Sequence, residues 1–207
     1  FIEGNAWNYG LYVPHAPEQL IDVMGGEARF VSFLDTLFVM EIEDRHIAQT
    51  EDITRDGIIG NYVHGNEPGH HIPYLYNWTA QPWKTEEKVR MILDRMYGDE
   101  TDGLCGNDDC GQMSAWYVFS AMGFYPVAPA SDRYYFGSPL LRSAVIDLGG
   151  GKQFRIIARD QSPENIYVAE ILLNGEPLDR RYITHGEITA GGMLEFVMTN
   201  TPAMPTR

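Results

Sequence analysis

The sequence predicts an α+β fold, in which a helical part is followed by an antiparallel β region. Up to about Tyr125, apolar residues recur at the spacing of one face of a helix. After Pro126, short β-branched runs alternate with Gly and Asn, which is typical of strands joined by tight turns. We therefore expect residues 1–130 to form the helical unit and residues 131–207 to form the β-strand region.

Six helical segments are expected in the first unit. Pro at an early position and Gly or Pro beyond the end delimit several of them. The expected helices cover residues 3–12, 17–24, 28–40, 66–78, 86–97 and 113–122. The polar stretch 41–62, which has scattered Ile and two glycines, is expected to be mostly loop.

The clearest strands lie in the second unit, at residues 144–148, 154–158, 166–173 and 194–198. Three consecutive glycines, 149–151, separate the first two strands, and Asn174-Gly175 follows the third. Such sequences favour tight turns between antiparallel neighbours.

Composition limits the classes of partner. The 207-residue chain has a formal net charge of −14, which argues against nucleic acid as a ligand. No apolar run reaches the length of a transmembrane helix. Cys105 and Cys110 are too few for a disulfide framework. Because the chain starts at Phe1 without an initiator methionine, we expect a processed or excised piece of a longer protein.

Two adjacent carboxylates, Asp108 and Asp109, lie in a glycine-flanked turn just before the last predicted helix. Acidic side chains at a helix N-terminus can cap exposed N–H groups and interact favourably with the helix dipole. The pair is therefore explained either by capping or by chemistry, and the pair alone does not decide between them.

Two further polar clusters begin predicted helices, at Glu3 and at residues 64–71. In a helical toroid, every second helix begins on the same rim, so these junctions can converge with the acidic turn. Separated carboxylates with oxygen ligands beside them suit metal-assisted hydrolysis of a glycosidic bond. Zinc is disfavoured because adjacent histidines on a helix diverge and no His-Glu-x-x-His motif is present.

Each cluster also has a structural explanation. A Glu such as Glu3 is usually a solvated surface residue, and Asn66 and Glu67 have the positions of an N-cap and a first helical turn. Aromatic residues of the helical unit are more often core than sugar platforms, although one or two at a rim would suit stacking on a pyranose. These aromatic residues are Trp7, Tyr9, Tyr12, Trp78, Trp83, Trp116 and Tyr117.

Taken together and in order, the polar blocks resemble the signature blocks of glycoside hydrolase family 92, which contains exo-acting, calcium-dependent, inverting α-mannosidases. The resemblance extends from Glu3 to the strands around Asn174. The blocks are Glu3-Gly4-Asn5-Ala6-Trp7, His64-Gly65-Asn66-Glu67-Pro68 with His70-His71, Gln81-Pro82-Trp83-Lys84-Thr85, residues 102–116 and Gly123-Phe124-Tyr125-Pro126-Val127.

The resemblance implies an architecture. Members of the family have an N-terminal β-sandwich domain followed by an (α/α)6 toroid, against which terminal β-structure packs. Residues 1–130 would then supply the later helices of the (α/α)6 catalytic domain, and the β-sandwich would be a partner missing from this sequence. The family is mostly bacterial and exported, so a periplasmic, cell-surface or secreted location is implied.

The resemblance also implies catalytic roles. Glu3 resembles the general acid and Asp109 the general base. Asn107 stands where many relatives have a second Asp. That difference leaves Asp109 as the main candidate for the base.

For ligands, Asn66 and Glu67 resemble the calcium-site block, with Gln112 as a weaker third. His64 and Gly65 resemble the region that lines the subsite for the departing sugar, and Trp7 and His70 are further candidates for substrate contact. Some relatives have an acidic residue at the position of Gly65, so a strict α-1,2 preference is not implied.

Two alternatives remain open. One is an enzyme of the same family that acts on mannose-phosphate diesters, whose better leaving group needs no acid at Glu3. The other is a non-catalytic fragment or carbohydrate-binding module, because the chain holds about half of the twelve helices of such a toroid. A mannose-containing glycan is the expected substrate, and the fragment alone is expected to be inactive.

Overall fold

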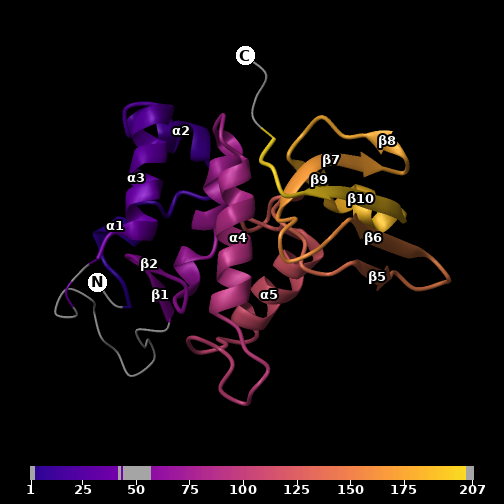
Figure 1. Ribbon diagram of the computed structural model, residues 1–207, viewed down its shortest axis with the longest axis horizontal. Helices are drawn as coiled ribbons and strands as arrows, with labels where there is room; N and C mark the ends of the chain where they lie inside the picture. The colour runs from indigo at the N-terminus through magenta and orange to yellow at the C-terminus, as the bar shows by residue number, and fades with distance from the viewer. Residues whose placement is uncertain (1–2, 42, 44–56, 204–207) are drawn as a thin grey trace.

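A computed structural model describes residues 3–41, 43 and 57–203 (Figure 1). Helices dominate the first part of the chain. They are α1 (Ala6–Tyr9), α2 (Pro17–Val23), α3 (Glu27–Val39), the 3-10 helices η3 (Glu67–Gly69) and η4 (Ile72–Trp78), α4 (Trp83–Arg95), α5 (Gln112–Met122) and, within the β region, α6 (His185–Ala190).

Three sheets accompany the helices. A two-stranded hairpin joins β1 (Ile58–Ile59) to β2 (Tyr62–Val63). A three-stranded antiparallel sheet has the order β3 (Phe124–Tyr125), β4 (Arg133–Phe136) and β9 (Tyr182–Thr184). The five-stranded sheet has the order β5 (Ser143–Asp147), β6 (Gln153–Arg159), β10 (Gly192–Thr199), β7 (Tyr167–Leu173) and β8 (Glu176–Pro177).

Register in the large sheet is antiparallel except between β6 and β10, which run parallel. Leu194 of β10 faces Ile156 on one side and Leu173 on the other. Buried and exposed residues alternate along β6, as one solvated face requires. The predicted fold class, a helical part followed by antiparallel strands, is confirmed, with this one parallel pairing added.

Several predicted boundaries differ from the structure. α1 is shorter than predicted because the Asn5 side chain accepts the Trp7 N–H and caps the helix one turn later than expected. The segment 66–78 forms two 3-10 helices instead of one α-helix. The loop expected at 41–62 lies mostly outside the described residues, and its described end forms the β1–β2 hairpin. The division of the chain at residue 130 stays a prediction.

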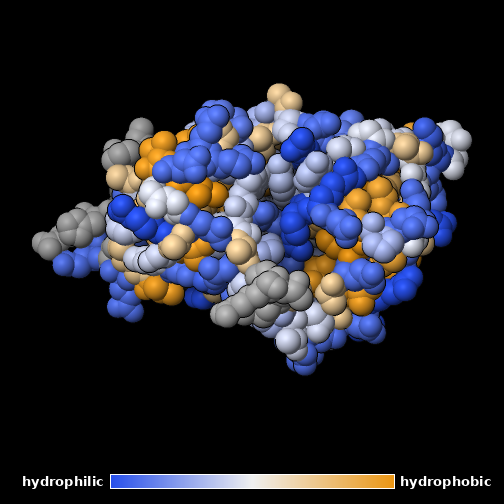
Figure 2. All heavy atoms as spheres, turned by 90° about the horizontal axis from the view of Figure 1, so that it is seen from above, coloured by the Kyte–Doolittle hydropathy of each residue, from blue (hydrophilic) through white to orange (hydrophobic). Residues whose placement is uncertain are grey.

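Helix α4 lies between the helical part and the sheets (Figure 1). On one side Val89, Ile92 and Leu93 belong to the helical core, while a second core lies under the large sheet around Phe154 and Phe196. Seen from above, Figure 2 shows two apolar areas separated by a strongly hydrophilic band. Among the described residues, no helix combines the length and the apolar character that a membrane span needs.

A buried ion pair joins α4 to the β region. Glu86 is 1% exposed and accepts hydrogen bonds from the Arg181 Nη2 at 2.7 Å and from the Val168 N–H at 3.0 Å. Burial raises the pKa of Glu86, and the Arg181 guanidinium opposes that shift. One turn further along, Arg90 donates to the Pro139 carbonyl at 2.6 Å. The two halves are thus held by charged groups that water reaches poorly.

Aromatic side chains and two histidines form the centre of the helical core. The His64 ring packs edge-on against Trp116, with centroids 4.5 Å apart. Its Nδ1 lies 2.8 Å from the Tyr62 hydroxyl and its Nε2 lies 2.7 Å from the Tyr97 hydroxyl. Burial lowers the pKa of His64, and burial lowers that of the neighbouring His70 to about 4. Both rings are therefore neutral at neutral pH.

The Glu86–Arg181 pair leads to a stability prediction. Arg181→Met should lower the free energy of unfolding by about 3 kcal/mol, because it leaves a buried carboxylate without its cation. Lys84→Met is the matched control, since its partner Asp35 is exposed and the loss should stay below about 1 kcal/mol. Urea unfolding measures both. Equal losses in the two variants would contradict the role assigned to the buried pair.

The buried histidines lead to a pH prediction. The pKa of His70 is about 4 in the folded chain, and about 6.5 when unfolded. Between these values the unfolded state binds more protons, so stability should fall as the pH falls from about 6.5 towards 4, by up to about 3 kcal/mol from this group. His70→Gln should flatten that dependence in unfolding experiments, with the exposed His15→Gln as control. An unchanged slope in His70→Gln would refute the assignment.

Candidate active site

Asn66 connects the start of the chain to the 3-10 helix η3. Its side chain is buried, and its Nδ2 donates to the Glu3 carbonyl at 2.6 Å and to the Tyr9 hydroxyl at 2.9 Å. Glu67, the first residue of η3, follows directly. Glu3 has a positive φ of 56°. The amide of Asn66 therefore holds an irregular backbone segment, which carries one predicted catalytic carboxylate, next to a second carboxylate.

The two aspartates of the acidic turn before α5 differ in their hydrogen bonds and exposure. Asp108 accepts the Ser114 N–H at 2.9 Å and the Ser114 hydroxyl at 3.0 Å, so it caps the first turn of the helix. The next three residues, Asp109, Cys110 and Gly111, all have positive φ, of 43°, 58° and 90°. The capping explanation thus holds for Asp108, whereas Asp109 is exposed on the tight turn that follows.

The backbone of the acidic turn packs closely against the backbone of the segment that precedes Glu67. A Cβ added to Gly65 would lie 2.7 Å from the Cys105 carbonyl oxygen, and one added to Gly106 would lie 2.6 Å from the Gly65 oxygen. A Cβ on Gly57 would meet the same Cys105 oxygen at 2.6 Å. Only residues without a side chain permit this approach, which brings Asp109 close to Glu67.

Three carboxylates converge at this point. Burial raises the pKa of Glu67, and the negative charge of Asp109, a hydrogen bond with that carboxyl and the charge of Glu3 raise it further. Glu67 Oε1 is buried and has no hydrogen-bond partner among the described residues. The predicted acid and base, Glu3 and Asp109, therefore both act electrostatically on the same central carboxylate.

The donor set at the centre suits a hard cation. Besides Glu67 Oε1, the carboxamide oxygen of Asn66 takes part in no hydrogen bond among the described residues, because its bonds are made by Nδ2. Carboxylate and amide oxygens are ligands that Ca²⁺ prefers. No group of three or more His, Cys, Asp or Glu with metal-binding geometry occurs in the described part of the chain. Asn66 and Glu67 fit a calcium site that needs further oxygen ligands.

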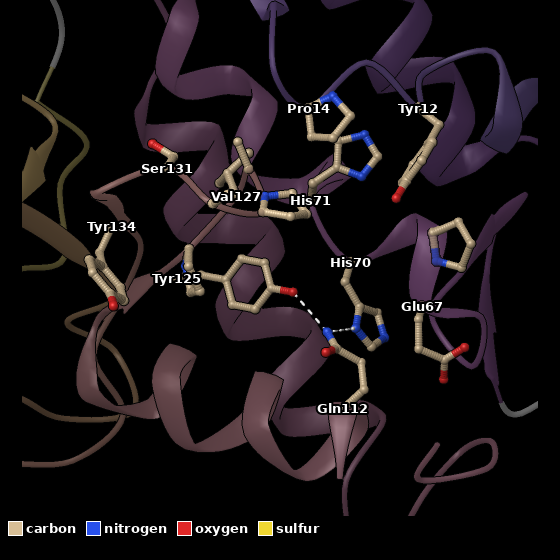
Figure 3. A pocket seen from close by; sticks show the side chains of 15 residues that line it. Tyr12, Pro14, Glu67, His70, His71, Gln112, Tyr125, Val127, Ser131 and Tyr134 are labelled. Carbon is tan, nitrogen blue, oxygen red and sulfur yellow. Dashed lines mark hydrogen bonds between the residues drawn. The ribbon is translucent and has the colours of Figure 1, made fainter. Parts of the chain in front are cut away.

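Gln112 lines the same cavity as Glu67. Its Nε2 donates to His70 Nδ1 at 3.2 Å and to the Tyr125 hydroxyl at 3.0 Å. In Figure 3 the His70 ring stands between Gln112 and Glu67. The role of Gln112 as a third calcium ligand stays a prediction.

Two of the predicted sugar contacts, His64 and Trp7, pack against aromatic residues of the helical part. His64 is fully buried, and both of its ring nitrogens are engaged by tyrosine hydroxyls. Trp7 stacks on Phe33 of α3 with ring centroids 4.4 Å apart, and it lines a separate cavity along α3. The substrate-contact role of these two residues stays a prediction.

The remaining predicted residues differ in access. Gly65 is buried and serves the close backbone contact, and Asn107 is exposed on the acidic turn. His70 is nearly fully buried, but it lines a cavity that also reaches Glu67. Of the predicted site residues, the structure brings Glu3, Asn66, Glu67 and Asp109 together, and a hydrogen bond joins His70 to Gln112 in the cavity beside them.

The cavity beside Glu67 has a volume of about 570 Å³. Tyr12, Tyr125 and Tyr134 contribute aromatic walls, and Gln112 lies on its floor (Figure 3). In the sequence, Tyr12 is one of several aromatic residues of the helical unit, and Tyr125 is part of the Gly123-Phe124-Tyr125-Pro126-Val127 block, so neither stands out as a site residue. A Tyr two residues after the helix-ending Gly123 is the signal that could have identified Tyr125.

Comparison with known proteins identifies relatives. The profile of the "Glycosyl hydrolase family 92 catalytic domain" matches residues 1–200. The family GH92 α-mannosidase BT3965 from Bacteroides thetaiotaomicron has a solved structure with a TM-score of 0.87 and 42% identity, over 98% of this chain and 26% of that one. The inverting mannosidase BT2199 from the same species superposes with a TM-score of 0.84 and 39% identity, over 99% of this chain and 28% of that one.

A curated fungal relative, described as an uncharacterized secreted glycosidase of Arthroderma benhamiae, is 29% identical over 95% of this chain and 23% of its own length. The chain thus spans about a quarter of the proteins that it matches. Since the family profile covers nearly every residue, the chain belongs to glycosyl hydrolase family 92.

Proposed function

We propose that the protein containing this chain is a calcium-dependent, inverting exo-α-mannosidase that removes terminal mannose from glycans. The observation that carries the proposal is the convergence of Glu3 and Asp109 on Glu67. The printed names of the relatives, an α-mannosidase and an inverting mannosidase, support the choice of sugar and stereochemistry.

Inversion requires two carboxyl groups with opposite tasks. One protonates the leaving oxygen while the other takes a proton from the attacking water, and a spacing of roughly 6.5–9.5 Å leaves room for that water. We assign the acid to Glu3, which is half-buried, and the base to Asp109, which is exposed and so open to water. Glu67, whose carboxylate is influenced by both Glu3 and Asp109, would hold the cation.

Asn66 and Glu67 would hold the calcium ion, whose charge would stabilise the electron-poor sugar ring that forms as the glycosidic bond breaks. The protein must hold the side-chain oxygens of Asn66 and Glu67 in fixed positions. Asn66 does so through its two Nδ2 hydrogen bonds, and Glu67 does so through its place at the start of η3.

The rest of the catalytic domain and the predicted N-terminal β-sandwich domain would complete the pocket. We propose export as the location, because the fungal relative is a secreted glycosidase. The alternative substrate, a mannose-phosphate diester, needs no acid, so the position of Glu3 beside Glu67 favours the glycoside.

Replacing the carboxyl group of Glu3 or of Asp109 by an amide should abolish turnover. In the complete natural protein, Glu3→Gln or Asp109→Asn should lower kcat on an α-mannoside at least about 10²-fold, since each removes a proton-transfer group. Asp108→Asn is the matched control for Asp109, because an amide oxygen can still accept the Ser114 N–H and cap α5. Near wild-type activity in Asp109→Asn or Glu3→Gln would reject the assigned role.

Calcium removal should inactivate the enzyme reversibly. A chelator should abolish mannoside hydrolysis, and added Ca²⁺ should restore it, because a hard cation with oxygen ligands is expected at Glu67. Glu67→Gln should weaken Ca²⁺ binding in calorimetry by at least about tenfold through loss of the anionic ligand. Activity that is indifferent to the chelator would remove calcium from the proposal.

A further inference from the structure

Tyr97, the residue after the C-cap of α4, contacts both chain segments that meet at the catalytic centre. Its backbone forms an isolated antiparallel bridge with Leu104, and the Gly98 N–H donates to the Gly103 carbonyl at 2.9 Å, which closes the loop between them. Leu104 begins the segment that leads to Asp109. The end of α4 therefore fixes the first end of that segment through the backbone of Tyr97.

The hydroxyl group of Tyr97 reaches the other end of the same segment. It donates to the Met113 carbonyl, in the first turn of α5, at 3.2 Å. Because a hydroxyl group has one proton, the Tyr97 oxygen must accept in its second hydrogen bond, which joins it to His64 Nε2 at 2.7 Å. One phenol group thus links the start of α5 to the residue just before Gly65, where the two backbones touch.

These hydrogen bonds determine where the proton lies on the buried His64 ring. Nε2 carries the proton that Tyr97 accepts, so Nδ1 of the neutral ring is an acceptor, and the Tyr62 hydroxyl at 2.8 Å donates to it. The bonds from Tyr62 of β2 to Met113 of α5 therefore all run in one direction. Reversing any of them would leave a buried polar group without a partner, which makes the arrangement rigid.

Packing fixes the Tyr97 ring as well as its hydroxyl group. The ring is parallel to that of Trp116, at an interplanar angle of 1° and a centroid distance of 5.9 Å, and its centroid lies 5.0 Å from that of Tyr117. Burial raises the pKa of Tyr97, so the hydroxyl keeps the proton that it donates. Tyr97 is not among the residues that line the cavity beside Glu67. Its influence on the site must therefore pass through other residues.

We propose that Tyr97 is a positioning residue for Asp109, an inference whose catalytic part rests on the proposed glycosidase function. Tyr97 holds both ends of residues 104–113 and so sets where Asp109 lies relative to Glu67. Asp109 is exposed on a turn of consecutive residues with positive φ, so anchors at the two ends of the segment limit its displacement. A displacement of about 1 Å can cost about 10²-fold in rate.

Hydrogen exchange on the complete natural protein tests the anchoring without any need for activity. Tyr97→Phe removes the hydroxyl and keeps the ring on Trp116. Exchange of the Gln112 and Met113 amides, which close the acidic turn, should become about tenfold faster, and the amides of β10 should be unchanged. Tyr117→Phe is the matched control, because the Tyr117 hydroxyl makes no hydrogen bond among the described residues.

Steady-state kinetics test whether Tyr97 acts through Asp109. On an α-mannoside, Tyr97→Phe should lower kcat about tenfold and leave KM nearly unchanged, because a displaced base is felt in the transition state more than in substrate binding. In an Asp109→Asn background the same substitution should cause no further loss, since the group that it positions is already gone. Tyr117→Phe should keep the wild-type kcat.

The outcomes separate this proposal from the proposed function. Turn amides that exchange at the wild-type rate in Tyr97→Phe, or an equal acceleration in β10, would overturn the anchoring. A loss of kcat that persists in the Asp109→Asn background would overturn the action through Asp109. A wild-type protein that does not hydrolyse α-mannosides would overturn the glycosidase function, and faster exchange confined to the turn would still support the anchoring by Tyr97.

Discussion

The site depends on a place where two chain segments touch backbone to backbone. Gly65 and Gly106 meet so closely that a Cβ on either would fall within 2.7 Å of the other segment. This contact presses the turn that carries Asp109 against the residue pair Asn66 and Glu67. Without it, Glu67 would have no second acidic neighbour, and both its raised pKa and its attraction for a cation would be weaker.

The rest of the helical part keeps that contact in place. The aromatic core around Trp116 fixes the strand end that carries His64, and Asp108 fixes the start of α5 on the other side of the turn. Helix α4 then ties this assembly to the sheets through Glu86 and Arg181. The β region therefore supports the site through α4, while the predicted catalytic carboxylates all come from the helical part.

Much of this arrangement could be predicted from the sequence. Helical spacing and β-branched runs identified α2, α3, α4 and the long strands to within a few residues. The short strands β3 and β9 and the short helix α6 were not identified. Elements of two to six residues carry too little periodicity, and the two strands are set by tertiary pairing. The parallel pairing of β6 with β10 likewise depends on the path of the chain between them.

The residue types of the site were predictable, but their individual tasks were not. Asp108 and Asp109 are indistinguishable as neighbours in a sequence, and only the hydrogen bonds to Ser114 separate the cap from the carboxylate that faces Glu67. His64 has the polar character of a ligand, yet it is a buried core residue because two tyrosines satisfy its nitrogens. A sequence motif predicts which residue types lie at the site. The role of each side chain depends on the neighbours with which its polar atoms form hydrogen bonds.

The most direct test of this account is a carbon-13 NMR titration of the Glu67 carboxyl group. The account predicts a pKa above the ordinary glutamate value, which falls when Asp109→Asn removes the neighbouring charge. An ordinary pKa for Glu67, or one that does not respond to Asp109→Asn, would show that the carboxylates do not form one site.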